Sequence, residues 1–316
     1  MQFSTWSELK SELDRMASDI NSQGLIFRGV KYHGYRLTPL LQRFFLEKKI
    51  PVDEWIPRER ASINFFMEKI LETPTLPTPP TWDVLGWLSF MQHYDVPTRL
   101  TDWTTSPLVA LFFAYNLNPS PLEDAALWCL NPEAFKEVFC LPSPNISDED
   151  LLRDENELLK MVIKKQISLP LPFTKWNPKE KRIAHQEGKF VAMGVLGEHT
   201  LSIDDWLTED AGALEKMIIV EQGNIPKSNR WMGPGRVFID RQGRPITLLQ
   251  QSDLFISKTL LPQSWKGEAL DYLKSRGVEG QRLLPRSQKL EEIADKTITF
   301  MLAPEALVSH QAPIFE

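Results

Sequence analysis

Cysteine and long apolar runs are both scarce in this sequence of 316 residues. Its two cysteines, Cys129 and Cys140, lack metal-ligand or redox spacing and are too few for a disulfide framework. That usage suits a reducing, cytoplasmic compartment. The longest apolar run, Leu108–Tyr115, is far shorter than the ~20 residues that a membrane-spanning helix needs. We therefore expect a cytoplasmic protein without a membrane contact, in which a large hydrophobic core stabilises the fold.

An excess of basic charge is missing as well, since the formal net charge is −6. A non-specific nucleic-acid binder is normally basic overall, and the short basic run at 175–182 is typical of a solvated loop. The sequence has no H-E-x-x-H, no Cys/His cluster and no carboxylate pair at ligand spacing, so we expect no metal. It also has no P-loop and no dinucleotide-binding glycine motif, and NAD binding of the Rossmann kind is not supported.

Strands and helices are mixed along the chain without a regular βαβ alternation, which favours the α+β class. The predicted helices, of which the first is amphipathic and unlike a signal peptide, cover 5–16, 39–46, 56–71, 82–94, 107–116, 147–165, 265–277 and 289–296. The predicted strands cover 25–27, 97–101, 124–130, 189–194, 216–221 and the hairpin 236–239/244–249, with 35–37 as an extended edge. The proline-rich stretch 73–80 is too short for a domain boundary, so residues 1–316 form one domain.

The segment Gln92–Ala114 carries most of the functional information. Ser106 followed by Pro107 is a strong helix start, because serine caps the first turn and proline is preorganised at its first position. A helix N-terminus offers free N–H groups and partial positive charge, which suit a phosphate. The hydroxyls of Thr104, Thr105 and Ser106 would surround that anion, so we expect an anion site there.

Charged and aromatic residues directly precede this helix start. Arg99 and Asp102 either line a cleft or pair with each other to fix the turn between strand and helix. His93 is a candidate catalytic group or a capping histidine. Tyr94 and Trp103 are either core residues or stacking surfaces for a base.

Several motifs of the chain resemble the FRG domain family. Phe27-Arg28-Gly29 is the tripeptide that gives this family its name, and QHYDVPTRLTDWT at 92–104 matches its central block. RIAHQEGKF at 182–190 and the segment 270–285 resemble two further blocks. The resemblance covers about residues 20–300. It implies insertions near 145–165 and 202–249.

A more distant similarity, to ADP-ribosyltransferases of the Arg–Ser–Glu type, implies a split sheet and NAD as the substrate. Arg28 would hold the pyrophosphate, since arginine binds phosphates in a planar, bidentate manner. Gln186 would contact the nicotinamide ribose, although Glu187 is the alternative because neighbouring strand residues face opposite sides. Asp102 would supply the carboxylate that this type of site needs. The residues implied in catalysis are Arg28, Asp102, Gln186 and His93. Those implied in NAD binding are Arg28, Tyr94, Arg99, Trp103, Thr104, Thr105 and Ser106.

The function expected from these resemblances is NAD-dependent ADP-ribosyl transfer to a macromolecule. The acceptor is a protein, DNA or RNA, and the enzyme would act as a toxin or anti-phage effector with a neutralising or regulatory protein partner. One alternative is a metal-independent nuclease that uses His93, His185 and Arg28 around a phosphate. Another is a non-enzymatic module that binds a nucleotide or a peptide.

Overall fold

The computed structural model describes residues 3–18, 24–76, 78, 84–116, 122–132, 171–173, 187–192, 237–239, 245–247, 256–279 and 288–308. The helices are α1 (Trp6–Ser18), α2 (Leu40–Glu47), α3 (Val52–Leu71), α4 (Val84–His93), α5 (Pro107–Asn116), the short 3₁₀ helix η3 (Gln263–Trp265), α13 (Lys266–Ser275), α15 (Gln288–Leu302) and α16 (Glu305–Val308). The strands are β1 (Ile26–Val30), β2 (Leu100–Thr104), β3 (Ala125–Leu130), β4 (Leu171–Phe173), β5 (Gly188–Ala192), β6 (Val237–Ile239), β7 (Pro245–Thr247) and β8 (Ile256–Leu261).

A six-stranded sheet in the order β4-β5-β2-β1-β3-β8 forms the centre of the fold, and all its strand pairs are antiparallel. Within each half, β4-β5-β2 and β1-β3-β8, neighbouring strands pair along three to six residues. The two halves are joined between β1 and β2 by one registered pair, Phe27 opposite Thr104. The predicted α+β class with a mainly antiparallel sheet is therefore confirmed.

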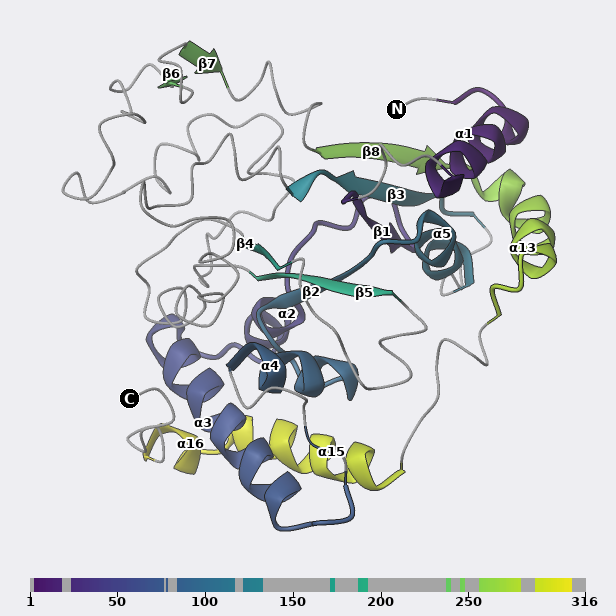
Figure 1. Cartoon of the computed structure of the whole chain (residues 1–316). Helices are drawn as coiled ribbons and strands as arrows, with labels where there is room; N and C mark the ends of the chain where they lie inside the picture. The colour runs from purple at the N-terminus through teal and green to yellow at the C-terminus, as the bar shows by residue number, and fades with distance from the viewer. Residues whose placement is uncertain are drawn as a thin grey trace.

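Helices α1, α5 and α13 cover one side of the sheet (Figure 1). Helix α5 lies directly on β1, where Gly29 makes the close approach possible. A Cβ added to Gly29 would overlap the carbonyl oxygen of Ala110 and lie 2.7 Å from the backbone nitrogen of Ala114. Phe27, on the same face of β1, is buried among the side chains of these helices. The pairing of β1 with α5 thus depends on a residue without a side chain.

A second hydrophobic core lies between the other side of the sheet and helices α2, α3, α4 and α15, which Figure 1 shows together with α16. Successive residues of β3 point to the two cores in turn, as strand geometry requires: Leu127 belongs to the first and Trp128 to the second. Phe65 of α3 stacks on Phe300 of α15 with ring centroids 4.4 Å apart. Both faces of the sheet therefore contribute side chains to a hydrophobic core.

Most predicted elements agree with the structure, and the differences have physical causes. The strand expected at 97–101 is shifted to 100–104, because Pro97 has no N–H and the carbonyl of Thr98 accepts from Leu41 of α2. Helix α3 begins at Val52, four residues before the expected start, and contains Pro57. Residues 35–37 form no strand. Strands β4 and β8 were not predicted, and the segments at 147–165 and 216–221 lie outside the described residues.

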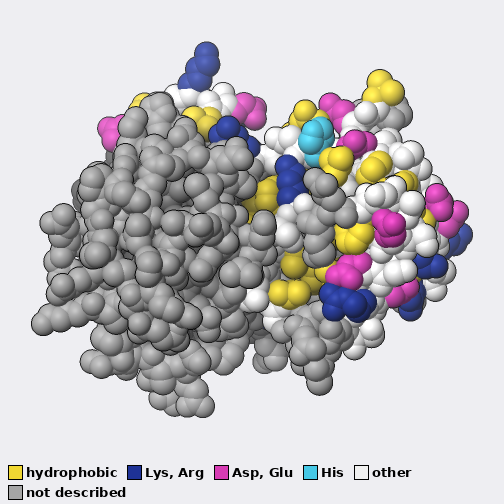
Figure 2. Space-filling model, turned by 90° about the horizontal axis from the view of Figure 1, so that it is seen from above, with side chains coloured by type: hydrophobic (Ala, Val, Ile, Leu, Met, Phe, Trp, Pro, Cys, Tyr) yellow, Lys and Arg dark blue, Asp and Glu magenta, His cyan; other side chains and the backbone are white. Residues whose placement is uncertain are grey.

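Basic, acidic and hydrophobic side chains are interspersed on the described part of the face in Figure 2. This mixture agrees with the net charge of −6 and shows no uniform field of one sign. No helix among the described residues combines the length and the apolar character needed to cross a membrane.

Candidate functional site

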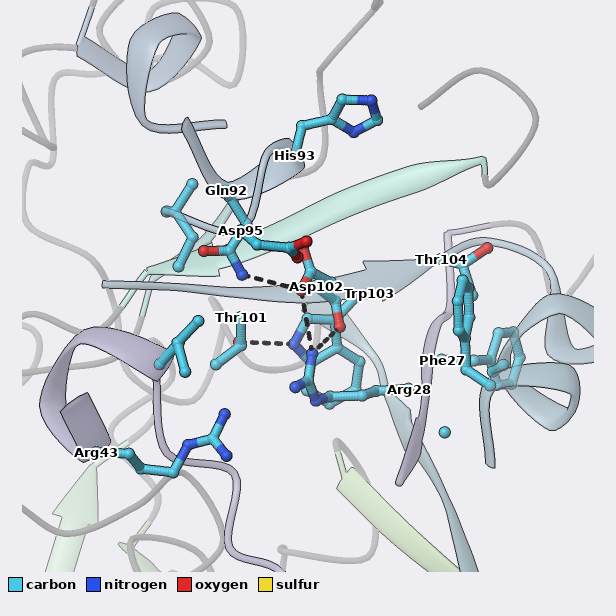
Figure 3. Close-up of a pocket in the computed structure, with 15 residues that line it drawn as sticks. Phe27, Arg28, Arg43, Gln92, His93, Asp95, Thr101, Asp102, Trp103 and Thr104 are labelled. Atoms are coloured by element: carbon cyan, nitrogen blue, oxygen red, sulfur yellow. Dashed lines mark hydrogen bonds and ion pairs between the residues drawn. The ribbon is translucent and has the colours of Figure 1, made fainter. Parts of the chain in front are cut away.

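A pocket of about 250 Å³ opens where β1 and β2 diverge beyond their single registered pair (Figure 3). Both strands, the end of α4, α2 and α5 contribute to its wall. Its charged or polar lining residues are Arg28, Arg43, Gln92, His93, Asp95, Thr101, Asp102 and Thr104. A split between two antiparallel strands leaves backbone groups unpaired, so ligand or side-chain partners have to satisfy them.

Arg28 of β1 spans this split. Its Nη1 donates a hydrogen bond to the backbone carbonyl of Asp102 on β2 and lies 3.9 Å from the Asp102 carboxylate. Its buried Nε has no hydrogen-bond partner among the described residues. Burial lowers the pKa of Arg28, the Asp102 charge opposes that shift, and Arg43 adds to it. Arginine stays charged in proteins, so Arg28 brings a cation with an unused donor to the pocket.

Asp102 is held in place by a short hydrogen-bond chain. Gln92 Nε2 donates to Asp102 Oδ2 over 2.9 Å, and Thr98 Oγ1 donates to Gln92 Oε1 over 2.6 Å. The Asp102 side chain is 59 % exposed, so one carboxylate oxygen can face a ligand. Thr98 fixes the amide orientation of Gln92, which in turn orients Asp102. Gln92 was not among the predicted site residues, because its role depends on a partner ten residues away.

Arg43 and Asp95 complete the charged lining and were also not predicted from the sequence. Arg43 is exposed on α2, and in Figure 3 it lies on the opposite side of the pocket from Asp95 and Gln92. Asp95 follows α4 with a φ of 62°, a left-handed conformation that Asp tolerates better than most residues. The pocket therefore contains two guanidinium groups and two carboxylates.

The predicted pairing of Arg99 with Asp102 is wrong. Arg99 forms a bidentate ion pair with Glu59 of α3, in which Arg99 Nε lies 2.7 Å from Glu59 Oε1 and Nη2 bonds Oε2. The two side chains are 0 % and 1 % exposed. Arg99 therefore does not line the pocket and has no surface for NAD. It connects the segment before β2 to α3.

The aromatic candidates lie in the core. Tyr94 is 8 % exposed and packs edge-on against Phe90. Trp103 is 3 % exposed and its Nε1 donates to Thr101 Oγ1 over 3.0 Å, although part of it lines the pocket. His93 also borders the pocket, but its ring points away from Arg28 and Asp102 in Figure 3. None of these rings presents an open face for base stacking.

The predicted anion site at the start of α5 is occupied by contacts within the protein. Thr104 Oγ1 accepts from the backbone N–H of Ser106, and Ser106 Oγ accepts from that of Val109, over 3.0 and 3.4 Å. Thr105 Oγ1 donates to the Glu187 carboxylate over 3.0 Å. Capping by Ser106 is confirmed, whereas a carboxylate already approaches the place expected for a phosphate.

The question of whether Gln186 or Glu187 faces the site is answered in part. Glu187 precedes β5 in a left-handed turn with a φ of 49°, so the alternation of strand faces does not apply to it. Its backbone carbonyl accepts from Thr105 over 3.1 Å. Glu187 therefore lies beside the end of β2, whereas Gln186 and His185 lie outside the described residues.

Residues 23–121 match the FRG domain family. The matched stretch contains β1, β2 and α2 to α5, and with them every residue that lines the pocket. No curated protein and no solved structure matches the chain.

The three residues of the FRG tripeptide have three different structural roles. Phe27 is buried under α5, Arg28 enters the pocket, and Gly29 allows α5 to touch β1. The central FRG block supplies Gln92 and Asp102 to the same pocket. The two motifs that define the resemblance, 74 residues apart at Arg28 and Asp102, therefore meet in space.

Proposed function

We propose that the protein transfers ADP-ribose from NAD⁺ to a macromolecular acceptor, with the β1/β2 pocket as the active site. The observation that carries the proposal is the pairing of cationic and anionic groups in one pocket. Arg28 and Arg43 line it together with Asp95 and Asp102. NAD⁺ has a matching pattern, since its pyrophosphate is anionic and its nicotinamide ring is cationic.

The roles of the residues follow from charge and hydrogen bonding. Arg28 offers an unused, buried N–H to a phosphate oxygen. Asp102, held by Gln92, faces the ribose, where positive charge develops as the glycosidic bond breaks. The bond between the ribose C1′ and the nicotinamide nitrogen breaks, and its electron pair leaves with neutral nicotinamide. The acceptor's nucleophilic atom then bonds to C1′ and releases its proton to a carboxylate or to water.

The size of the pocket limits how much of NAD⁺ it encloses. Its volume of about 250 Å³ is below the ~300–1,000 Å³ of sites that bury drug-sized ligands. In the proposed complex the pocket holds the nicotinamide ribose and an adjoining phosphate, and the rest of the dinucleotide lies outside it. The two neighbouring acids suit the reacting end of NAD⁺.

No specific observation favours the nuclease alternative. Acid–base cleavage by two histidines needs both imidazoles beside the phosphate. The ring of His93 points away from Arg28, and His185 lies outside the described residues. A binding module without turnover would use the same pocket, so a measurement of turnover separates it from the transferase.

The proposal is tested by incubating the purified protein with NAD⁺ labelled in its adenylate part and with cell lysate. Wild type should release nicotinamide and transfer label to a macromolecule. Arg28→Ala should reduce both by at least about 100-fold, the typical loss when one preorganised electrostatic group is removed. Arg15→Ala, at an exposed arginine of α1, is the matched control and should keep wild-type activity. Binding of NAD⁺ without nicotinamide release would support the binding module and refute the transferase.

A further inference from the structure

The segment that contains β1 and most of α2 has an unusual charge composition for this chain. Residues 20–46 contain four basic residues and one histidine, but no Asp or Glu, in a protein whose formal net charge is −6. Two of the basic residues, Arg28 and Arg43, line the pocket. The other two, Lys31 and Arg36, lie with three aromatic rings in the loop 31–36. This basic–aromatic loop therefore lies in the sequence between two residues that line the pocket, Arg28 and Leu40.

The rings of the loop pack against each other and stay accessible. Tyr32 contacts His33 and Tyr35 edge-on, with centroids 5.0 and 5.4 Å apart, and Lys31 Nζ lies 5.8 Å from the Tyr35 ring centre. Tyr35 is 44 % exposed. A Cβ at Gly34 would come within 2.6 Å of the Tyr32 ring, so this glycine lets the loop fold tightly. The loop presents an aromatic surface with cations beside it.

The loop is fixed to the sheet. The backbone N–H of His33 donates to the carbonyl of Asp124 over 2.8 Å. The backbone carbonyl of His33 accepts from Lys258 Nζ over 2.5 Å. Asp124 is itself held, because its Oδ1 accepts from the backbone N–H of Gln263 over 2.8 Å. Because these contacts hold the loop backbone, ordering the loop on a ligand costs little entropy.

Strand register connects this surface with the pocket. Arg28 pairs with Trp128 of β3, and Trp128 pairs with Lys258 of β8, so the three side chains form a row on one face of the sheet. Lys258 Nζ lies 4.9 Å from the Trp128 ring centre. Buried Nε1 of Trp128, like Nε of Arg28, has no hydrogen-bond partner among the described residues. The row thus has a cation at each end, Arg28 in the pocket and Lys258 beside the loop, with the buried Trp128 between them.

We infer that the loop 31–36 and Lys258 bind a single-stranded nucleic acid and present it to the pocket as the acceptor of ADP-ribose. Single strands bind where exposed aromatic rings stack on bases beside cations that follow the phosphates. A local patch of this kind does not need a basic protein overall. The inference relies on the proposed transferase for the acceptor role, but not for binding.

Binding is tested by fluorescence anisotropy with labelled oligo-dT and oligo-rU of about 12 nucleotides, within the ~4–16 nucleotides that single-strand sites cover. The measurements with both oligonucleotides use the full chain without NAD⁺. We expect saturable binding whose affinity falls with salt, with a log–log slope of about −2 for three phosphate contacts at ~0.7 each. A duplex of the same length should bind more weakly, because its bases cannot stack on Tyr35.

Two pairs of variants locate the binding surface. Tyr35→Ala should weaken binding by roughly 5- to 150-fold, the range for loss of one base–aromatic stack, whereas Tyr35→Phe should bind like wild type. Lys258→Ala should lower the affinity and reduce the salt slope, whereas Lys274→Ala, at an exposed lysine of α13, should do neither. Nicotinamide release from NAD⁺ alone should be unchanged in Tyr35→Ala, because Tyr35 does not line the pocket.

The outcomes separate the inference from the proposed function. Absence of oligonucleotide binding at low salt, full binding by Tyr35→Ala, or label found only on protein would overturn the inference while leaving the transferase intact. Conversely, oligonucleotide binding that depends on Tyr35, without any nicotinamide release, would confirm the surface and refute the transfer reaction. Label on the oligonucleotide that requires both Arg28 and Tyr35 would support both.

Discussion

At the scale of single residues, Arg99 and Glu59 form an ion pair that is almost completely buried, with 0 % and 1 % of the side chains exposed. Removing one partner of such a pair leaves an uncompensated charge in the core. We expect Arg99→Ala to lower the free energy of unfolding by about 3–5 kcal/mol, measured by urea denaturation. The double variant Glu59→Leu/Arg99→Met should cost less than the single one, because no charge stays buried. A loss below about 1 kcal/mol for Arg99→Ala would contradict this account of the pair.

Substitution of Asp102 should affect activity and not stability, because the Asp102 side chain is 59 % exposed. In the proposed reaction Asp102 faces the ribose, so Asp102→Asn should lower nicotinamide release by about 100- to 1,000-fold, mainly in kcat. The urea midpoint should stay close to that of wild type. Asp271→Asn, at an exposed aspartate of α13, is the matched control and should leave release unchanged. Full activity of Asp102→Asn would exclude Asp102 from the reaction.

At the scale of elements, the contact between β1 and α5 depends on Gly29. Gly29→Ala would place a methyl group against the Ala110 carbonyl and the Ala114 nitrogen, which are backbone atoms that cannot rotate away. We expect a loss of at least about 1–3 kcal/mol, as for overpacked cores, in thermal or urea unfolding. Gly267→Ala is the matched control, because Gly267 lies in α13 with nothing within 4 Å of the added carbon. It should stabilise the protein by up to about 1 kcal/mol.

Helices α1 and α13 are joined by Tyr272, whose hydroxyl donates to Asp14 Oδ1 over 2.7 Å. Burial, then the hydrogen bond and the charge of Asp14, raise the pKa of Tyr272 to about 12. A raised tyrosine pKa means stability that is complete below the unfolded value of about 10 and lost as pH rises toward 12.

Wild type should therefore exceed Tyr272→Phe in stability by about 1 kcal/mol near neutral pH, the typical contribution of one hydrogen bond. That difference should shrink between pH 10 and 12, the interval from the ordinary pKa of a tyrosine to the pKa of Tyr272 in the folded protein. Urea unfolding of both proteins across this range measures it. A difference that is constant with pH would mean that ionisation of Tyr272 does not affect the α1–α13 contact.

At the scale of the whole molecule, the sequence predicts features that depend on neighbouring residues. It does not predict pairings between residues that are distant in the chain. Ser106-Pro107 predicts the start of α5, because capping and proline geometry act within one turn. Strand β8 was not predicted, since its existence depends on pairing with β3 more than a hundred residues earlier. Likewise, the sequence places Arg99 near Asp102, but only the packing of α3 brings Glu59 to it.

In the candidate site, too, some residues could be predicted from sequence motifs and others only from the packing of the fold. Arg28 and Asp102 were recognisable from the family motifs, and the structure brings them together across the split sheet. Arg43 and Asp95 carry no motif, and their membership in the pocket results from how α2 and the end of α4 pack beside β1 and β2. Tyr94 and Trp103 could be core residues or stacking surfaces as far as the sequence shows, and their burial in the structure places them in the core.

The central claim is that NAD⁺ binds in the split between the two halves of the sheet. The most direct measurement is a crystal structure with a hydrolysis-resistant NAD⁺ analogue. The account predicts a phosphate oxygen within hydrogen-bond distance (~2.7–3.2 Å) of Arg28, and the nicotinamide ribose facing Asp102. An analogue bound elsewhere on the protein, with the β1/β2 pocket unchanged, would contradict the account.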